Sequence, residues 1–199
     1  MSAKEGSIGS MLRLGLILAA FAVVSCALLA VVNNITAPVI EQNNIQKANQ
    51  AMKAVFADAD NFKQVTDFAP SADASVTIDK FFVAESGGNA KGVVVQVTGP
   101  TYDKATLVVG FDLTGTVTGV QFLALTDSPG FGLKANDPTY TVKSGKTFYG
   151  QFTGLKASDG FKAGSTFDAI SGATITSNGV AGLLTAASGS ALSYLEGLR

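Results

Sequence analysis

A run of nineteen residues without a charge, from Leu14 to Val32, constrains this chain more than any other feature. Its only clearly polar member is Ser25. A helix needs about 20 mostly apolar residues to cross the hydrocarbon core of a bilayer, so the run predicts a transmembrane helix. A cleaved signal peptide is the alternative, but its apolar core has only about 7–15 residues. We therefore expect an uncleaved span.

The last residues of this run and those on either side of it indicate whether the chain is cleaved there and how the helix is oriented in the membrane. Residues 23–26, ending in Cys26, are similar to the cleavage box of a bacterial lipoprotein, but the chain stays apolar beyond the cysteine. Lys4 and Arg13 precede the run, whereas the next basic residue after it is Lys47. Basic residues favour the cytoplasmic side. The N-terminus is therefore predicted inside the cell, with the remainder of the chain on the extracytoplasmic side.

The chain after the run divides into a connector and a larger domain. We expect three parts, namely residues 1–35 as tail and transmembrane helix, 36–75 as connector and 76–199 as the domain. Apolar residues at helical spacing predict an amphipathic helix over about 37–56, capped by Thr36 with Pro38 in its first turn. It could pack against a neighbouring subunit, the membrane lipid or its own domain. Polar residues 58–75 are read as loop.

The larger domain alternates strand-forming and turn-forming segments. Four strands are predicted over about 76–84, 92–98, 105–112 and 116–125, and their short connections indicate an antiparallel meander. Val93, Val95 and Val97 should share one face. Two further short strands are predicted at 140–142 and 147–150, and an apolar stripe predicts a final helix over about 177–198. The expected fold class is α+β, with an N-terminal transmembrane helix and an antiparallel-sheet domain closed by a C-terminal helix.

A cluster of hydroxyls precedes that final helix, in the sequence Asp168-Ala-Ile-Ser-Gly-Ala-Thr-Ile-Thr-Ser177. Hydroxyls and unpaired N–H groups at the partly positive end of a helix suit a phosphate group. The alternative is a Ser/Thr-rich turn that merely caps the helix. Residue pattern alone leaves both interpretations open.

Absent residue types exclude several function classes. The sequence has no histidine and one cysteine, which excludes histidine-dependent triads, histidine-ligated haem and a cysteine-ligated iron–sulfur cluster. The formal net charge of −1 argues against a nucleic-acid partner. We expect no metal site and no catalytic residue set. Redox chemistry would need an organic cofactor.

The order Asp-x-x-Ser-Gly-Ala-Thr resembles the site at which a flavin transferase links FMN to threonine through a phosphoester. It is similar to the sites of the G subunit of Rnf complexes and the C subunit of the sodium-pumping NADH:quinone oxidoreductase. The resemblance implies that Thr174 carries a covalent FMN, with Thr176 and Ser177 as alternative acceptors in the same turn. It assigns flavin-transferase recognition to Asp168 together with the rest of the motif. The motif residues expected at the cofactor are Ser171, Gly172, Ala173, Thr174 and Thr176.

A second loop supports the same resemblance. Ser128-Pro-Gly-Phe131 is similar to the Thr-Pro-Gly-Leu loop of this flavin-binding family, with serine replacing threonine and phenylalanine replacing leucine. Pro-Gly also suits a plain type II turn. The resemblance implies that Ser128, Pro129, Gly130 and Phe131 contact the flavin ring.

The function implied is that of an electron-transfer subunit carrying covalent FMN in an Rnf-type ion-translocating ferredoxin:NAD oxidoreductase. Its implied partners are other integral membrane subunits and, during maturation, a flavin transferase. Such a subunit takes part in the redox reaction of its complex and is not catalytic alone. The alternatives are the quinone reductase C subunit, a stand-alone extracytoplasmic flavoprotein, and a membrane-anchored adhesin-like protein without a flavin.

Overall fold

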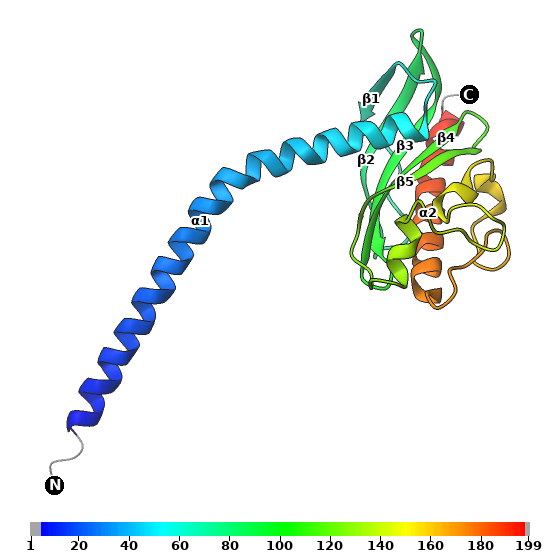
Figure 1. The fold of residues 1–199 in the computed structure, drawn as a ribbon. Helices are drawn as coiled ribbons and strands as arrows, with labels where there is room; N and C mark the ends of the chain where they lie inside the picture. The colour runs from blue at the N-terminus through cyan, green and yellow to red at the C-terminus, as the bar shows by residue number, and fades with distance from the viewer. Residues whose placement is uncertain (1–4, 198–199) are drawn as a thin grey trace. The chain divides into compact units, whose positions relative to one another are not determined.

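The computed structural model describes residues 5–197 (Figure 1). Their contacts form two units, one ending at Gln46 and one beginning at Lys47. Helix α1 (Glu5–Val55) runs through the first unit and ends in the second. From Gly9 onward α1 is long and apolar enough to cross a bilayer, and its most apolar window is fully exposed. This is the only such helix in the described part of the chain.

The prediction that a separate helix begins near Thr36 is wrong. Pro38 lies inside α1, and the Thr36 hydroxyl donates to the carbonyl of Val32 (2.9 Å) rather than capping a new helix. A hydroxyl that bonds back to the preceding turn is compatible with an uninterrupted helix. Because proline lacks an N–H, it removes one backbone hydrogen bond, and the helix continues on either side of it.

The second unit contains a five-stranded antiparallel sheet whose spatial order is the order along the chain. The strands are β1 (Asn61–Val65), β2 (Thr77–Ser86), β3 (Asn89–Pro100), β4 (Lys104–Asp112) and β5 (Val117–Leu125). Strands β2 to β5 confirm the predicted meander. Strand β1 corrects the prediction of a loop over 58–75, since it pairs with β2 from Asn61 opposite Glu85. The Asp60 carboxylate supports this pairing by accepting the N–H of Gly87 (3.0 Å).

Apolar side chains cover both faces of this sheet. Helix α2 (Thr174–Gly197) contributes Leu183 and Leu184 to the core that includes Val93, Val95 and Val97, so the predicted common face of these valines is confirmed. The opposite face packs against the last turns of α1 in a second cluster. Its principal members are Ala51, Met52, Val55, Val94 and Val108.

Two paired glycines make room for the end of α1. Gly110 and Gly119 lie opposite each other in the β4–β5 pair, beneath Val55. A Cβ atom added to Gly119 would lie 3.0 Å from the Cα atom of Val55, closer than real Cβ contacts normally allow. The Thr118 hydroxyl donates to the carbonyl of Val55 (2.5 Å). The helix end is therefore seated on β4 and β5 by close backbone approach and a hydrogen bond.

The segment between β5 and α2 contains short turns of 3-10 helix instead of the predicted strands. These are η1 (Gly132–Asn136), η2 (Tyr149–Phe152) and η3 (Ala157–Asp159). Thr141 and Thr147 form an isolated bridge, and the strands predicted at 140–142 and 147–150 are wrong. Phe148 and Phe152 are fully buried and pack edge-on against Phe167. This aromatic packing explains why the segment coils into the core rather than extending.

Candidate functional site

The hydroxyl-rich motif forms a tight turn that leads directly into α2. Gly172 has a φ of +79°, a conformation that glycine adopts without steric cost. The N–H of Ala173 donates to the carbonyl of Ile170 (3.0 Å), which closes the turn. Helix α2 begins at Thr174, three residues before the predicted start. Thr174 is therefore the first helical residue rather than a residue ahead of the helix, in the turn whose N–H groups lack intrahelical acceptors.

The hydroxyls of the motif fall into two groups. Thr176 and Ser177 are 1% and 0% exposed, and both are engaged in hydrogen bonds. Ser177 Oγ accepts the N–H of Ile170 (3.0 Å) and donates to the carbonyl of Ala173 (3.0 Å). Ser171 and Thr174, in contrast, are exposed. Two hydroxyls thus hold the turn together, and two face solvent where a ligand or another protein can reach them.

The Ser128–Phe131 loop lies against the motif. The N–H of Phe131 donates to the carbonyl of Ser128 (3.3 Å), and Gly130 has a φ of +77°, as a type II turn requires. A Cβ atom added to Gly172 would lie 3.3 Å from the Phe131 ring, which is itself 56% exposed. The structure therefore brings together the two segments that the sequence singles out, with an exposed aromatic ring beside the glycine of the motif.

A buried carboxylate links this loop to α2, and sequence reasoning did not identify it. Asp127 is 2% exposed and accepts four hydrogen bonds. The donors are Thr101 Oγ1 (2.5 Å), Thr176 Oγ1 (2.6 Å), the N–H of Asp103 (2.9 Å) and the N–H of Tyr102 (3.3 Å). Burial raises the pKa of Asp127, but these hydrogen bonds together outweigh it and lower the pKa below the ordinary 3.8. Asp127 is therefore ionised at neutral pH.

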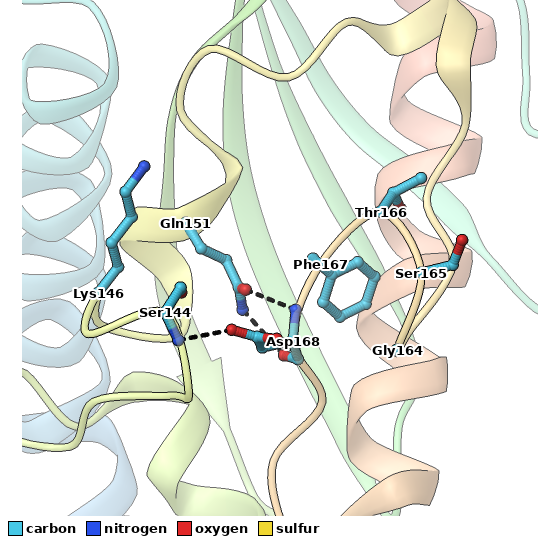
Figure 2. A pocket seen from close by; sticks show the side chains of 8 residues that line it. All are labelled: Ser144, Lys146, Gln151, Gly164, Ser165, Thr166, Phe167 and Asp168. Carbon is cyan, nitrogen blue, oxygen red and sulfur yellow. Dashed lines mark hydrogen bonds between the residues drawn. The ribbon is translucent and has the colours of Figure 1, made fainter.

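Asp168 occupies a different position, in a pocket of about 280 Å³ that Figure 2 shows from close by. Its Oδ2 atom accepts the N–H of Ser144 (2.7 Å). The Gln151 side chain accepts the N–H of Asp168 (2.8 Å) and donates to its carbonyl (3.1 Å). Asp168 thus links its own loop to the loop that carries Ser144, and both loops border the pocket. Thr174 does not line this pocket. Sequence reasoning missed both Ser144 and Gln151, which lack a recognisable spacing from the motif.

This arrangement suits an organic phosphate ligand. The exposed Thr174 hydroxyl stands at the positive end of α2, and an exposed aromatic ring lies next to the adjoining turn. Among residues 5–197, no three histidine, cysteine, aspartate or glutamate side chains gather closely enough to hold a metal ion. The geometry therefore favours a ligand with an anionic group and a flat apolar part.

Comparisons with known proteins agree with this interpretation. Residues 1–55 match the RnfG N-terminal region family, and residues 101–188 match the FMN-binding domain family. The chain is 30% identical over 183 residues to the G subunit of the Na(+)-translocating ferredoxin:NAD(+) oxidoreductase complex of Acetobacterium woodii, covering 84% of this chain and 85% of that protein. The chain belongs to the RnfG family.

Two further relatives extend the comparison beyond one organism. The G subunits of the ion-translocating oxidoreductase complexes of Methanosarcina acetivorans and Pseudomonas aeruginosa are 30% and 32% identical to this chain, respectively. These alignments cover 82% and 86% of this chain, and 85% and 84% of the relatives. The similarity therefore spans most of each protein rather than a single motif.

The family match covers the residues of the candidate site. The FMN-binding region, residues 101–188, includes Thr101, Asp127, the Ser128–Phe131 loop and the whole hydroxyl-rich motif. The elements that converge around Thr174 therefore all belong to the part of the chain that matches a flavin-binding family.

Proposed function

We propose that this protein carries FMN as a phosphoester on Thr174 and relays electrons within a membrane-bound, ion-translocating oxidoreductase complex. The observation that supports this assignment most is the separation of the hydroxyls in the first turn of α2. Thr174 is exposed, whereas the alternative acceptors Thr176 and Ser177 are buried and hydrogen-bonded. Of the three hydroxyls in the first turn of α2, only that of Thr174 is therefore accessible to a transferase.

The residues around Thr174 fit the parts of FMN. An ester phosphate on its Oγ atom would lie at the N-terminal end of α2, where the helix dipole and free N–H groups favour an anion. Ser171 and Gly172 would border the phosphate, and the exposed Phe131 ring offers a flat apolar surface for the isoalloxazine. FMN, when bound, supplies one- and two-electron redox chemistry. The protein's own contribution is to orient the flavin and to fix it in place.

The proposed cellular setting follows from α1 and from the relatives. Helix α1 would anchor the chain as a single membrane pass, with the N-terminus cytoplasmic and the FMN domain extracytoplasmic, as the basic residues before the apolar run suggest. The partners would be the integral membrane subunits of an Rnf-type complex. The match of residues 1–55 to the RnfG N-terminal region favours this setting over the C subunit of the quinone reductase.

A denaturing gel tests the covalent bond. The full chain, made in cells that contain a flavin transferase, should give a band that fluoresces under ultraviolet light, and peptide mass analysis should place FMN on Thr174. Thr174→Ala should abolish the fluorescence. Thr153→Ala, which removes another exposed threonine hydroxyl of the same domain and does not line the pocket around Asp168, should leave it unchanged. A dark wild-type band from cells that flavinylate other proteins would contradict the proposal.

A second comparison tests whether the transferase recognises the Asp168 carboxylate or whether Asp168 only joins two loops through its hydrogen bond to Ser144. Asp168→Asn keeps an oxygen that can accept the N–H of Ser144 but removes the charge, whereas Asp168→Ala removes both. If the transferase reads the carboxylate, both variants should remain unmodified while folding normally. Full modification of the Asn variant would show instead that Asp168 acts only by joining the two loops.

A further inference from the structure

Large apolar side chains are exposed at few places outside α1. In the described chain these are Tyr102 (63%), Leu113 (43%), Phe131 (56%) and Ile175 (60%). Ile175 adjoins Thr174 in sequence, and Phe131 contacts the turn that precedes it. Since single exposed apolar residues are ordinary, their concentration on segments near one candidate site is the informative observation.

Asp127 lies between the three segments that carry Tyr102, Phe131 and Ile175. It accepts the N–H of Tyr102 itself and the hydroxyl of Thr176, the residue after Ile175. Gly132, the residue after Phe131, packs so closely that an added Cβ atom would lie 2.5 Å from Asp127 Cβ and 2.7 Å from Thr176 Oγ1. The carboxylate therefore lies where the β3–β4 turn, the Ser128–Phe131 loop and the first turn of α2 meet.

The hydrogen bonds to Asp127 are suited to holding these segments in one arrangement. A carboxylate that accepts hydrogen bonds makes stronger ones than a neutral acceptor does. A buried carboxylate also loses much free energy if its donors withdraw, so the donors are held to it. The Thr176 hydroxyl is the connection to α2, and it lies within two residues of Thr174.

We infer that Asp127 is a positioning residue for the flavin site and acts through its hydrogen bond to Thr176. This bond would hold Thr174 beside an apolar surface, the platform, that consists of the side chains of Tyr102, Phe131 and Ile175. The platform takes the isoalloxazine ring of the FMN attached to Thr174. This inference rests on the proposed function and deepens it. It assigns roles to Asp127, Tyr102, Thr176 and Ile175 that the flavin-attachment motif does not contain.

The test uses the full chain in detergent, its flavin transferase, and substitutions at Thr176. Thr176→Val keeps the shape of the side chain but removes the hydrogen bond to Asp127, and Thr176→Ser restores a hydroxyl. Thr185→Val is the matched control, because the Thr185 hydroxyl donates to Ala181 within α2 and away from Asp127. The initial rate of FMN attachment is measured below the unfolding temperature of every variant, together with the fluorescence yield of the attached flavin.

We expect Thr176→Val to slow attachment about tenfold, as loss of a hydrogen bond to a charged group predicts. Its attached flavin should fluoresce more strongly, because the ring leaves the aromatic side chains. Thr176→Ser and Thr185→Val should behave like the wild type. A merely structural hydrogen bond would lower the unfolding temperature without changing the rate or the fluorescence.

Two outcomes would overturn the inference in distinguishable ways. If Thr176→Val is modified at the wild-type rate with wild-type fluorescence, the positioning role is wrong and the proposed function stands. If the wild-type chain itself stays unmodified by an active transferase, the proposed function and this inference both fail. Should Thr176→Val not fold, Thr101→Val in the β3–β4 turn removes the other short hydrogen bond to Asp127 and is subject to the same criteria.

Discussion

Gly172→Ala tests directly whether the backbone of the motif governs the proposed attachment of FMN. At a φ of +79° an alanine enters the left-handed region, which costs about 1–2 kcal/mol. The added Cβ atom would also lie 3.3 Å from the Phe131 ring, which must move by a few tenths of an ångström. Gly88→Ala is a matched control, because Gly88, in the turn between β2 and β3, has a φ of +80° but open space around it and does not line the Asp168 pocket.

Both variants should therefore lose a similar amount of stability. For a chain of this size, 1–2 kcal/mol corresponds to a fall of about 2–8 °C in the unfolding midpoint. Tyrosine fluorescence can follow the transition, since the sequence has four tyrosines and no tryptophan. Only Gly172→Ala should also slow FMN attachment, because only there does the new methyl group displace Phe131. Equal attachment rates for the two variants would refute the importance of the Gly172–Phe131 contact.

Four further substitutions test the packing and the electrostatics. Gly119→Ala should lower the unfolding free energy by about 1–3 kcal/mol in denaturant titrations, because the methyl group meets Val55. Gly182→Ala, at an exposed α2 position with open space, should raise the thermal midpoint through a gain of about 0.5–1 kcal/mol. Phe148→Ala should cost about 3–5 kcal/mol in the same titrations, since the ring is fully buried. Asp127→Asn should weaken the dependence of stability on pH below pH 3.8, as measured by thermal midpoints across an acid series.

The sign of that last effect follows from the direction of the shift. The folded-state pKa of Asp127 lies below its ordinary value, so the unfolded chain binds the proton more readily. The stability contributed by its hydrogen bonds is therefore complete above the unfolded pKa and is lost as the pH falls through the folded pKa. A variant without this carboxylate lacks that part of the acid dependence. An acid series with the same slope for wild type and variant would contradict the assignment.

Local periodicity predicted the regular elements of this fold well. The alternation of Val93, Val95 and Val97 with Val94 identifies both faces of β3, because side chains of a strand alternate between faces. Strand β1 escaped the prediction since its sequence, Asn-Phe-Lys-Gln-Val, is short and mostly polar, and its existence depends on pairing with β2. The predicted break at Thr36 failed because residue type alone does not distinguish a helix cap from a hydroxyl bonded to the preceding turn.

The candidate site was only partly predictable. Proline and glycine in the Ser128–Phe131 loop predict its turn. The roles of this loop and of the motif around Gly172, in contrast, followed only from the resemblance to a flavin-binding family. Asp127 was not recognised, since an aspartate between a strand and a Pro-Gly turn looks like an ordinary turn residue. Its importance arises from donors at Thr101 and Thr176, which only the tertiary fold brings to one carboxylate. The same applies to Gln151 beside Asp168.

The order of strands in the sheet has a consequence for how the domain matures during synthesis. Each strand from β2 to β5 pairs with the strand made just before it, so the sheet can assemble progressively as the chain emerges. Helix α2 is the last element to be made, and Asp127 can bind Thr176 only after that helix arrives. Thr174 therefore acquires its setting at the end of folding. Attachment of the flavin would thereby mark completed molecules, and truncated chains ending before α2 could never acquire it.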